Sequence, residues 1–262
     1  MSIDFWKMHG AGNDFILVDD RTLSFPVKDA TFIRRFCDRR RGVGSEGLLL
    51  IQPSSIANLR MRFFNPDGSE VDMCGNGARC LARLAYEIGA ATADMRIETA
   101  AGLLRAEVIL PVVRLHLPPP CDWRLNLSVD WQGRQLPVHF VNSSVPHAIS
   151  VVEDLTAVDV PALGAAIRHH ALFAPAGTNA DFIQITGPDS LAIRTFERGV
   201  EAETLACGTG IVGAALIADK LKLVQAPVRV TTAGGDRLEV NLHPLTLTGP
   251  AEHSFRGQFD YR

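Results

Sequence analysis

Apolar and polar positions alternate over many short stretches of this chain, and they follow a helical period over four longer ones. The short alternating or β-branched stretches predict strands. They are residues 15–19, 48–52, 61–65, 95–99, 106–110, 113–117, 138–141, 148–152, 181–185, 191–195, 228–231 and 238–242. The predicted helices are 28–39, 77–88, 158–169 and 208–220. Because strands outnumber helices and regular strand–helix alternation is missing, the predicted class is α+β.

Two of these predicted helices follow the same tetrapeptide. Cys74-Gly75-Asn76-Gly77 precedes the second helix, and Cys207-Gly208-Thr209-Gly210 precedes the fourth, 133 residues later. Both helices are apolar on most faces, as is typical of a helix enclosed by a sheet. The repeat predicts two pseudo-symmetric domains, each a curved, mostly antiparallel sheet around a central apolar helix. The active site is expected in the cleft between the domains.

Proline marks the expected boundary between the two domains. Pro118-Pro119-Pro120 fits neither a helix nor a central strand. We therefore expect a first domain over residues 1–117, with Cys74, and a second over 118–251, with Cys207. The C-terminal segment, about 252–262, is expected to return to the first domain.

Composition restricts the function. The 262 residues carry a net charge of −3, which gives no electrostatic case for nucleic-acid binding. The N-terminus does not resemble a signal peptide, and no uncharged apolar run reaches the ~18 residues of a membrane span. An odd, irregularly spaced set of five cysteines then favours reduced thiols in a cytoplasm. Cys37, Cys80 and Cys121 are expected to be small buried apolar residues.

The two remaining cysteines predict chemistry that one thiol cannot do. The positive end of a helix dipole stabilises a thiolate, and the adjacent N–H groups bind anions such as a substrate carboxylate. If both helix starts address one carboxylate, a thiolate at Cys74 or Cys207 can remove the α-proton. The opposite thiol then delivers a proton to the other face, which inverts the stereocentre. We find no pyridoxal-lysine context, dinucleotide fingerprint or zinc-ligand spacing, so no cofactor and no metal are expected.

Several further motifs, in the same order, resemble those of the diaminopimelate epimerases, which are cofactor-independent amino-acid racemases. The resemblance covers essentially the whole chain. The matching stretches are 7–15 (KMHGAGNDF), 42–47 (GVGSEG), 64–70 (FNPDGSE), 73–80 (MCGNGARC), 146–148 (PHA), 197–199 (ERG) and 206–210 (ACGTG). The resemblance implies an isomerase that interconverts LL- and meso-2,6-diaminopimelate, for lysine and peptidoglycan precursor synthesis. It implies a small-molecule substrate and no membrane or nucleic-acid partner, and it is compatible with a homodimer.

The resemblance also implies individual roles. Cys74 and Cys207 would be the catalytic thiols, with His147 near the first cysteine and Glu197 near the second cysteine and the substrate amine. Backbone N–H groups for the reacting carboxylate would come from Gly75, Asn76, Gly208 and Thr209. The polar residues implied to hold the substrate are Asn13, Asn65, Asn179, Glu197 and Arg198, with Arg198 suited to the distal carboxylate.

One departure and two rival interpretations remain. Val145 occupies a position where many family members have Asn, so the distal carboxylate would depend on Asn142 or Ser144 for compensation. Proline racemases and hydroxyproline epimerases share the paired cysteines, but usually carry His at the position of Asn76. A racemase of another amino acid is therefore one alternative. A dithiol redox sensor or a non-catalytic amino-acid-binding protein is the other.

Overall fold

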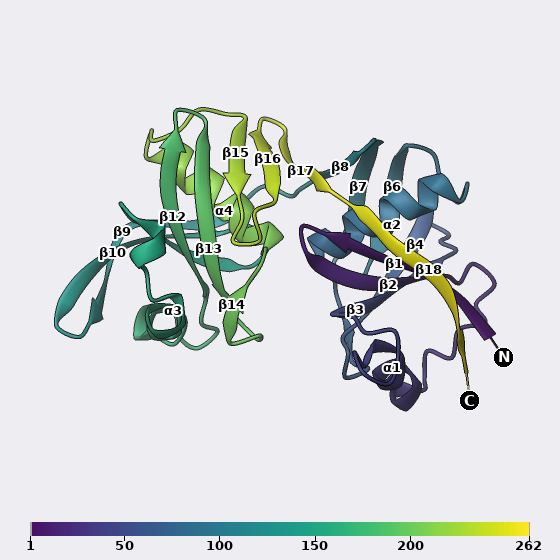
Figure 1. Ribbon diagram of the computed structural model, residues 1–262. Coiled ribbons are helices and arrows are strands. Elements are labelled where there is room, and N and C mark those ends of the chain that lie inside the picture. Colours follow the sequence, from purple (N-terminus) through teal and green to yellow (C-terminus); the bar gives the residue numbers. More distant parts are fainter. Residues whose placement is uncertain (1, 262) are drawn as a thin grey trace. The chain divides into compact units, whose positions relative to one another are not determined.

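The computed structural model describes residues 2–261 and divides into two compact units (Figure 1). The first unit comprises residues 1–116 and 249–262, and the second comprises residues 117–248. Each unit is a predominantly antiparallel sheet with two α-helices. The α+β class predicted from the pattern is therefore confirmed.

The first unit begins with a hairpin and contains the segment around Cys74. Its elements are β1 (Ser2–Gly10), β2 (Asn13–Asp19), α1 (Ala30–Cys37), β3 (Gly47–Gln52), β4 (Leu59–Phe64), β5 (Glu70–Val71), α2 (Gly75–Glu87), β6 (Asp94–Thr99), β7 (Gly102–Ile109), β8 (Val112–His116) and β18 (Glu252–Asp260). Helix α2 starts two residues before the predicted position, directly after Cys74.

The second unit contains the segment around Cys207. Its elements are β9 (Cys121–Trp131), β10 (Arg134–Asn142), β11 (Pro146–Val151), α3 (Val160–Arg168), β12 (Asn179–Gly187), β13 (Ser190–Glu197), β14 (Ala202–Thr204), α4 (Gly208–Lys220), β15 (Val228–Thr231) and β16 (Arg237–Leu242). Strand β17 (Leu245–Pro250) follows, and short 3-10 turns span Leu155–Ala157 and Ala171–Phe173.

The two units repeat one topology. Each begins with an antiparallel pair, β1–β2 or β10–β11, and then crosses through a helix to a parallel neighbour, β3 or β12. Each continues through an antiparallel strand, β4 or β13, that also pairs in parallel with β6 or β15. The apolar helix lies between these last two strands in sequence, as α2 in one unit and α4 in the other. The internal repeat in the sequence therefore corresponds to a duplicated fold.

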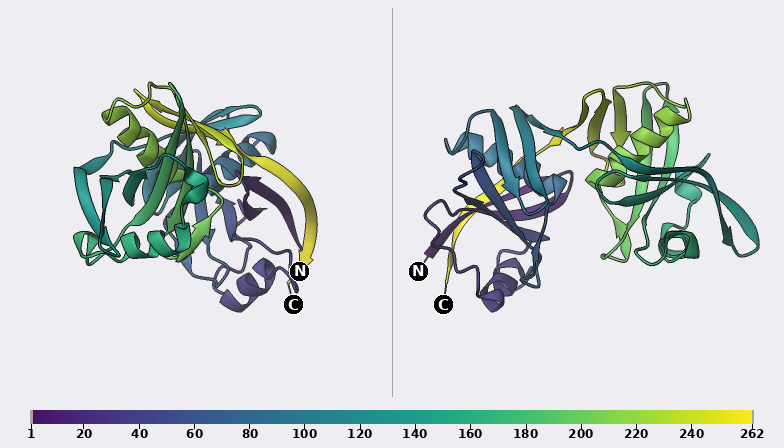
Figure 2. Two further views of the ribbon diagram at one scale, coloured as in Figure 1. Left: turned by 60° about the vertical axis from the view of Figure 1, so that its left-hand side comes forward. Right: turned by 180° about the vertical axis from the view of Figure 1, so that it is seen from behind.

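One strand in each unit lies outside the repeat. The C-terminal β18 pairs antiparallel with β1, so the yellow and purple ends of the chain lie side by side (Figures 1 and 2). In the second unit the corresponding place beside β10 is taken by β9, and these two form a long hairpin. Each unit thus closes one edge of its sheet with a different segment of the chain.

The two central helices are buried against the sheets, and this packing holds their first residues in place. Helix α4 is buried at nine successive residues, Gly210–Ala218, and contacts strands β10, β11, β12, β13, β15 and β16. Helix α2 is buried from Asn76 to Ala82 and contacts β1, β2, β3, β7 and β8. Outside each sheet, α1 and α3 cover further apolar clusters, which contain Phe32 and Phe36 in one unit and Phe182 and Phe196 in the other. No helix within residues 2–261 has both the length and the apolar character that a membrane span requires.

Candidate active site

Cys74 is the N-cap of α2, in extended backbone conformation, and its thiol lies beside Asn13. The Sγ atom donates to Asn13 Oδ1 over 3.7 Å. Asn13 opens β2 after a two-residue turn in which Ala11 and Gly12 both have positive φ, as in the tight turns that join hairpin strands. The turn after β1 therefore places the Asn13 amide at the start of α2.

A buried arginine fixes the orientation of the amides around Cys74. Arg79 is completely buried; its Nη2 donates to Asn76 Oδ1 over 2.8 Å, and its Nε donates to Pro250 O. With its oxygen occupied in this way, Asn76 donates through Nδ2 to Asn13 Oδ1 over 3.2 Å. The Asn13 oxygen thus receives both the Asn76 amide and the Cys74 thiol. We call Asn13, Cys74, Gly75 and Asn76 the Cys74 cluster.

Gly75 leaves the entrance to this helix start open. A Cβ atom built on Gly75 would meet no heavy atom within 4 Å. N–H groups in the first turn of a helix lack acceptors within the helix. An anion can therefore approach the backbone at Gly75 without a steric conflict.

Asn65 lies in a turn rather than in the Cys74 cluster. Its backbone N–H donates to Ser69 O, and its backbone carbonyl oxygen accepts from Gly68 N. Its side-chain amide donates to Ser69 Oγ over 3.2 Å. Within residues 2–261 these contacts join it to its own turn and not to Cys74. A substrate-binding role for Asn65 stays a prediction.

Cys207 is the N-cap of α4 and is more enclosed than Cys74. Cys207 is 8% exposed, and its Sγ lies 3.5 Å from Thr209 Oγ1. Ser143 Oγ donates to the carbonyl oxygen of Thr209 over 2.8 Å and so ties the first turn of α4 to the segment between β10 and β11. The second thiol is thus held at a helix start, as the sequence predicted.

His147 and Asp181 form a buried pair next to this helix start. Both side chains are completely buried, and His147 Nδ1 lies 2.7 Å from Asp181 Oδ2. His147 Nε2 lies 2.9 Å from Thr209 Oγ1. Its position next to the first cysteine, which the resemblance implies, stays a prediction.

Asn179 joins the histidine to Arg198. Its Nδ2 donates to Pro146 O over 2.9 Å and lies 3.5 Å from His147 Nε2, while its Oδ1 accepts from Arg198 N over 2.8 Å. The Arg198 guanidinium is partly exposed and donates to Ala176 O through Nη1. Glu197 accepts from Thr204 Oγ1 over 2.9 Å. We call His147, Asn179, Asp181, Glu197, Arg198, Cys207, Gly208 and Thr209 the Cys207 cluster.

Strand register explains why these polar side chains meet. In the parallel pair β11–β12, His147 lies opposite Asn179. Residues 179 and 181 alternate with Ala180 and Phe182, which belong to the apolar cluster under α3. Because successive side chains of a strand point to opposite faces, Asn179 and Asp181 share a face with the start of α4. The other face builds the core.

Burial opposes ionisation of the second thiol. Desolvation raises the pKa of Cys207 well above its ordinary value, and the negative charges of Glu197 and Asp181 raise it further. Hydrogen bonds from Thr209 and from the Gly210 N–H act in the opposite direction on this pKa but do not offset burial. Burial therefore outweighs, at Cys207, the thiolate stabilisation that a helix N-terminus predicts.

The other three cysteines lie outside both clusters. All five cysteines are in the reduced form. Cys37 and Cys80 are buried, as expected, and burial raises the pKa of Cys80 to about 12. The expectation for Cys121 was wrong, because it is exposed at the first position of β9. Its place directly after the triple proline, at the end of a strand, leaves it little to pack against.

Sequence reasoning missed the residues that hold the site residues in place through hydrogen bonds. These are Arg79, Ser143, Asp181 and Thr195, whose Oγ1 donates to Asp181 Oδ1 over 2.8 Å. A signal existed for Asp181, because it is a charged residue two positions from Asn179 and lies between the apolar residues Ala180 and Phe182. Arg79 gave no such signal, since an arginine in a helix is usually exposed.

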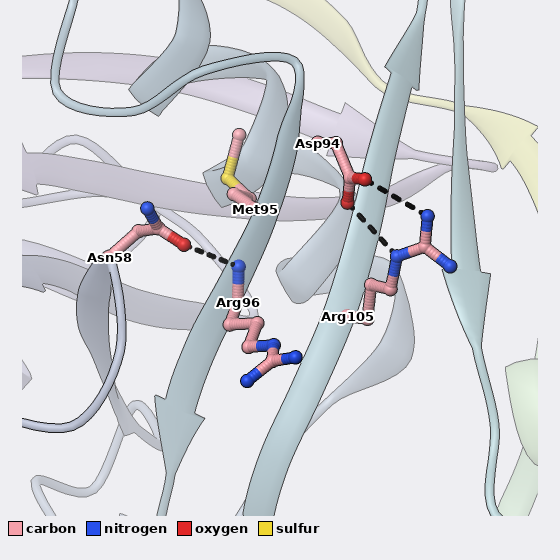
Figure 3. Close-up of a pocket in the computed structure, with 5 residues that line it drawn as sticks. All are labelled: Asn58, Asp94, Met95, Arg96 and Arg105. Atoms are coloured by element: carbon pink, nitrogen blue, oxygen red, sulfur yellow. Dashed lines mark hydrogen bonds and ion pairs between the residues drawn. The ribbon is translucent and has the colours of Figure 1, made fainter.

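A surface pocket in the first unit has a different character (Figure 3). It is lined by Asn58, Asp94, Met95, Arg96 and Arg105. Arg105 donates twice to Asp94 over 2.9 Å, and Asn58 Oδ1 accepts from Arg96 N. None of the predicted site residues lines it. The Arg105–Asp94 contact is a cross-strand ion pair between β6 and β7.

The sequence matches one family model in both halves of the chain. The model described as diaminopimelate epimerase matches residues 5–109 and 139–252. Curated relatives named diaminopimelate epimerase are similar over their full length. One from Aquifex aeolicus is 41% identical, over 98% of this chain and 97% of its own. One from Chlorobaculum tepidum is 43% identical, over 95% and 98%.

Solved structures with lower identity share the fold. A phenazine biosynthesis protein of the PhzF family from Bacillus anthracis superposes with a TM-score of 0.76 at 16% identity, over 100% of both chains. A probable proline racemase from Agrobacterium radiobacter gives 0.71 at 17% identity, over 99% of this chain and 93% of its own. A hydroxyproline epimerase from Agrobacterium vitis gives 0.70 at 15% identity, over 98% and 92%. At this identity the likeness concerns the two-domain fold.

Proposed function

Since the chain belongs to the diaminopimelate epimerase family, we propose that it interconverts LL- and meso-2,6-diaminopimelate with Cys74 and Cys207 as its acid–base pair. The observation that carries this proposal is the repeated helix start. In each unit a cysteine occupies the N-cap position of a buried helix whose first residue is glycine. One such thiol would be an ordinary feature of a fold, but two in duplicated units supply an acid and a base of the same kind.

The proposed reaction begins when one thiolate removes the α-proton of the substrate. The other thiol donates its proton to the opposite face, so the configuration inverts and the two cysteines exchange protonation states. Negative charge that develops on the α-carboxylate is stabilised by backbone N–H groups at the two helix starts, Gly75 with Asn76 and Gly208 with Thr209. The reaction then needs only this chain and the substrate.

The remaining proposed roles concern binding. The side-chain amides of Asn13 and Asn76 bind each other beside the first thiol. The Asn179 side chain accepts from the backbone N–H of Arg198 and so holds Arg198 in place. We assign the Arg198 guanidinium to the distal carboxylate and Glu197 to the substrate amine, since each offers the opposite charge. Asn65 is assigned to the substrate from the resemblance alone. A cytoplasmic location and a homodimer also remain predictions, as does a place in lysine and peptidoglycan precursor synthesis.

Hydrogen exchange at the α-carbon tests this function directly. The full-length protein is incubated with LL-diaminopimelate in deuterated water, and the α-hydrogen signal and the diastereomer ratio are followed by proton NMR. We expect the α-signal to disappear while meso isomer accumulates. A binding protein would leave the signal intact. A redox sensor would instead change its activity toward a partner only on thiol oxidation.

A further inference from the structure

The turn between β13 and β14 carries Arg198, and side chains hold the peptide groups on both sides of its Cα atom. The N–H of Arg198 donates to Asn179 Oδ1 over 2.8 Å, and the next N–H, that of Gly199, donates to Glu201 Oε1 over 2.9 Å. Because these two N–H groups flank the Arg198 Cα atom, they set the direction in which its side chain leaves the backbone. The resemblance implies a substrate role for Asn179 but none for Glu201.

Glu201 is itself held by the last turn of α3. Its Oε1 also accepts from Arg168 Nε over 3.0 Å, and only 17% of the Arg168 side chain is exposed. The Arg168 guanidinium lies against Gly177, where an added Cβ atom would come within 1.8 Å of Nη1. The residue before Gly177 accepts from the Arg198 guanidinium through Ala176 O. Glu201 thus joins the turn that carries Arg198 to a helix.

The backbone conformation of Glu201 indicates that its side chain contributes. Its φ is +57°, in the left-handed region that glycine adopts easily and glutamate rarely. Its N–H donates to Glu197 O over 2.8 Å, which closes the turn in that conformation. Glycine would close this turn with less strain, so a glutamate here implies a use for its carboxylate. The Gly199 N–H and the Arg168 guanidinium lower the pKa of this carboxylate, which keeps it charged at neutral pH.

We propose that Glu201, anchored by Arg168, is a positioning residue that directs Arg198 toward the distal carboxylate of the substrate. This inference rests on the proposed function and deepens it, because it names a determinant of specificity for substrates with two charged ends. A guanidinium makes a forked contact only in a narrow geometry, so a small rotation at the Arg198 Cα atom weakens binding. The helix starts that address the reacting carboxylate stay as they are. Loss of the Glu201 carboxylate should therefore raise KM and leave kcat nearly unchanged.

Steady-state kinetics on LL-diaminopimelate test this role in the full-length protein. Glu201→Ala should raise KM about 10-fold, the lower limit for losing one hydrogen bond to a charged group, with kcat within about twofold of wild type. Glu201→Gln keeps an acceptor for the Gly199 N–H and should raise KM less. Glu201→Gly should raise KM as Glu201→Ala does, although its backbone strain is relieved. Glu203→Ala is the matched control with wild-type KM, because the Glu203 carboxylate pairs with Arg194 over 2.7 Å on the same hairpin.

A double variant separates positioning from a direct effect of Glu201 on the substrate. If Glu201 acts only through Arg198, Glu201→Ala should raise KM no further in an Arg198→Ala background. Amide hydrogen exchange of the peptide that contains residues 197–201, followed by mass spectrometry, reports on the turn without any substrate. This exchange should be faster in Glu201→Ala than in wild type or Glu203→Ala.

The possible outcomes are distinct. A KM for Glu201→Ala within about twofold of wild type would overturn the proposal, as would an equal rise in Glu203→Ala or in the Arg198→Ala background. If the wild type does not exchange the α-hydrogen of diaminopimelate, the proposed function fails. Amide exchange still judges the positioning in that case, and an unchanged exchange rate in Glu201→Ala would show that Glu201 does not hold the turn.

Discussion

At the scale of single residues, the five cysteines have three different environments. Cys37 and Cys80 are buried in the first unit, Cys121 is exposed, and Cys74 and Cys207 cap helices. Only the last two lie where a thiol meets both a helix start and polar side chains. Environment therefore separates candidate catalytic thiols from structural ones, although all five are the same residue type.

Replacement of either helix-capping cysteine should abolish epimerisation. Each face of the carbanion needs its own acid or base, so Cys74→Ala and Cys207→Ala should each lower kcat by at least ~100-fold. Steady-state kinetics in both directions measure this loss, and circular dichroism checks the fold. Cys37→Ala, Cys80→Ala and Cys121→Ala are the controls and should stay active, with packing losses of about 1 kcal/mol at the two buried sites. Near-wild-type turnover in either capping variant would contradict the acid–base pair.

Burial of Cys80 should make the protein less stable at alkaline pH. Its pKa is raised from 9.0 to about 12 because the folded state removes the thiol from water. Below pH 9 both states carry the neutral thiol, so the free energy of unfolding is unaffected. Above this pH the unfolded chain ionises first, and stability is lost as the pH approaches 12. Urea unfolding from pH 8 to 10.5 should show a smaller decline in Cys80→Ala than in wild type. Equal declines would show that this thiol is not the source.

At the scale of secondary structure, the hydrophobic pattern predicted the positions of helices and strands, but it did not predict which strands pair. The four helices and twelve strands with clear periodicity are present, because their buried faces repeat over several residues. Six strands were missed, namely the longer β1, β9, β17 and β18 and the short β5 and β14. Burial along β18 and β9 is low and irregular, since these are edge strands that expose polar side chains. Their pairing with β1 and β10 is a tertiary contact that no local pattern encodes.

The predicted site residues show the same division. Motif spacing was enough to predict that Cys74 and Cys207 cap helices, because the cap is local. The contact of His147 with Asp181 and Thr209 depends on the register of two strands and on the packing of α4 against them. Such contacts join residues 34 and 62 positions apart, so the sequence alone could not assign them.

Replacement by alanine should change the free energy of unfolding differently at two glycines of the helix starts. A Cβ at Gly210 would lie 2.6 Å from Asp181 Oδ1 and 3.2 Å from His147 Cε1, and both side chains are buried. Gly210→Ala should therefore lower the free energy of unfolding by about 1–3 kcal/mol. Gly75→Ala meets nothing within 4 Å and should leave stability unchanged or raise it by up to ~1 kcal/mol.

The kinetic constants of the same two variants should also differ. If a substrate carboxylate approaches the Gly75 backbone, the added methyl group obstructs it, and Gly75→Ala should raise KM while the fold stays intact. Thermal unfolding and steady-state kinetics on both variants give the comparison. An unchanged KM in Gly75→Ala would place the carboxylate elsewhere. An unchanged melting temperature in Gly210→Ala would mean that β12 can move away from α4.

At the scale of the whole molecule, the duplication explains how one fold can supply two equivalent thiols. Apart from β9 and β18, each unit has the same strand pairing and begins its buried helix at the same relative place. The polar surroundings nevertheless differ, with two amides around Cys74 and a carboxylate–imidazole–hydroxyl series around Cys207. The two copies therefore share the helix start and differ in the polar side chains that surround its cysteine.

The substitution at Val145 bears on which amino acid this molecule prefers. An isopropyl group stands where the family resemblance leads us to expect an amide, and Val145 is partly buried between exposed Ser144 and the start of β11. One hydrogen bond to a carboxylate contributes about 1.5–3 kcal/mol. Its uncompensated loss would weaken binding of the distal end ~10- to 150-fold. We expect Arg198, Asn65 and Asn179, with Asn142 or Ser144, to hold that end.

Specificity constants test this expectation for the complete protein. LL-Diaminopimelate should remain preferred, and a slow reaction on a shorter amino acid such as glutamate should be detectable, because the clamp on the distal end has lost one donor. Arg198→Ala should raise KM for diaminopimelate far more than it changes the side reaction, since the shorter substrate has no distal amino-carboxylate to lose. Val145→Asn is the matched gain-of-contact variant and should tighten diaminopimelate binding selectively. A clear wild-type preference for a substrate without a distal amino-carboxylate would overturn the substrate assignment and leave only the two-thiol chemistry.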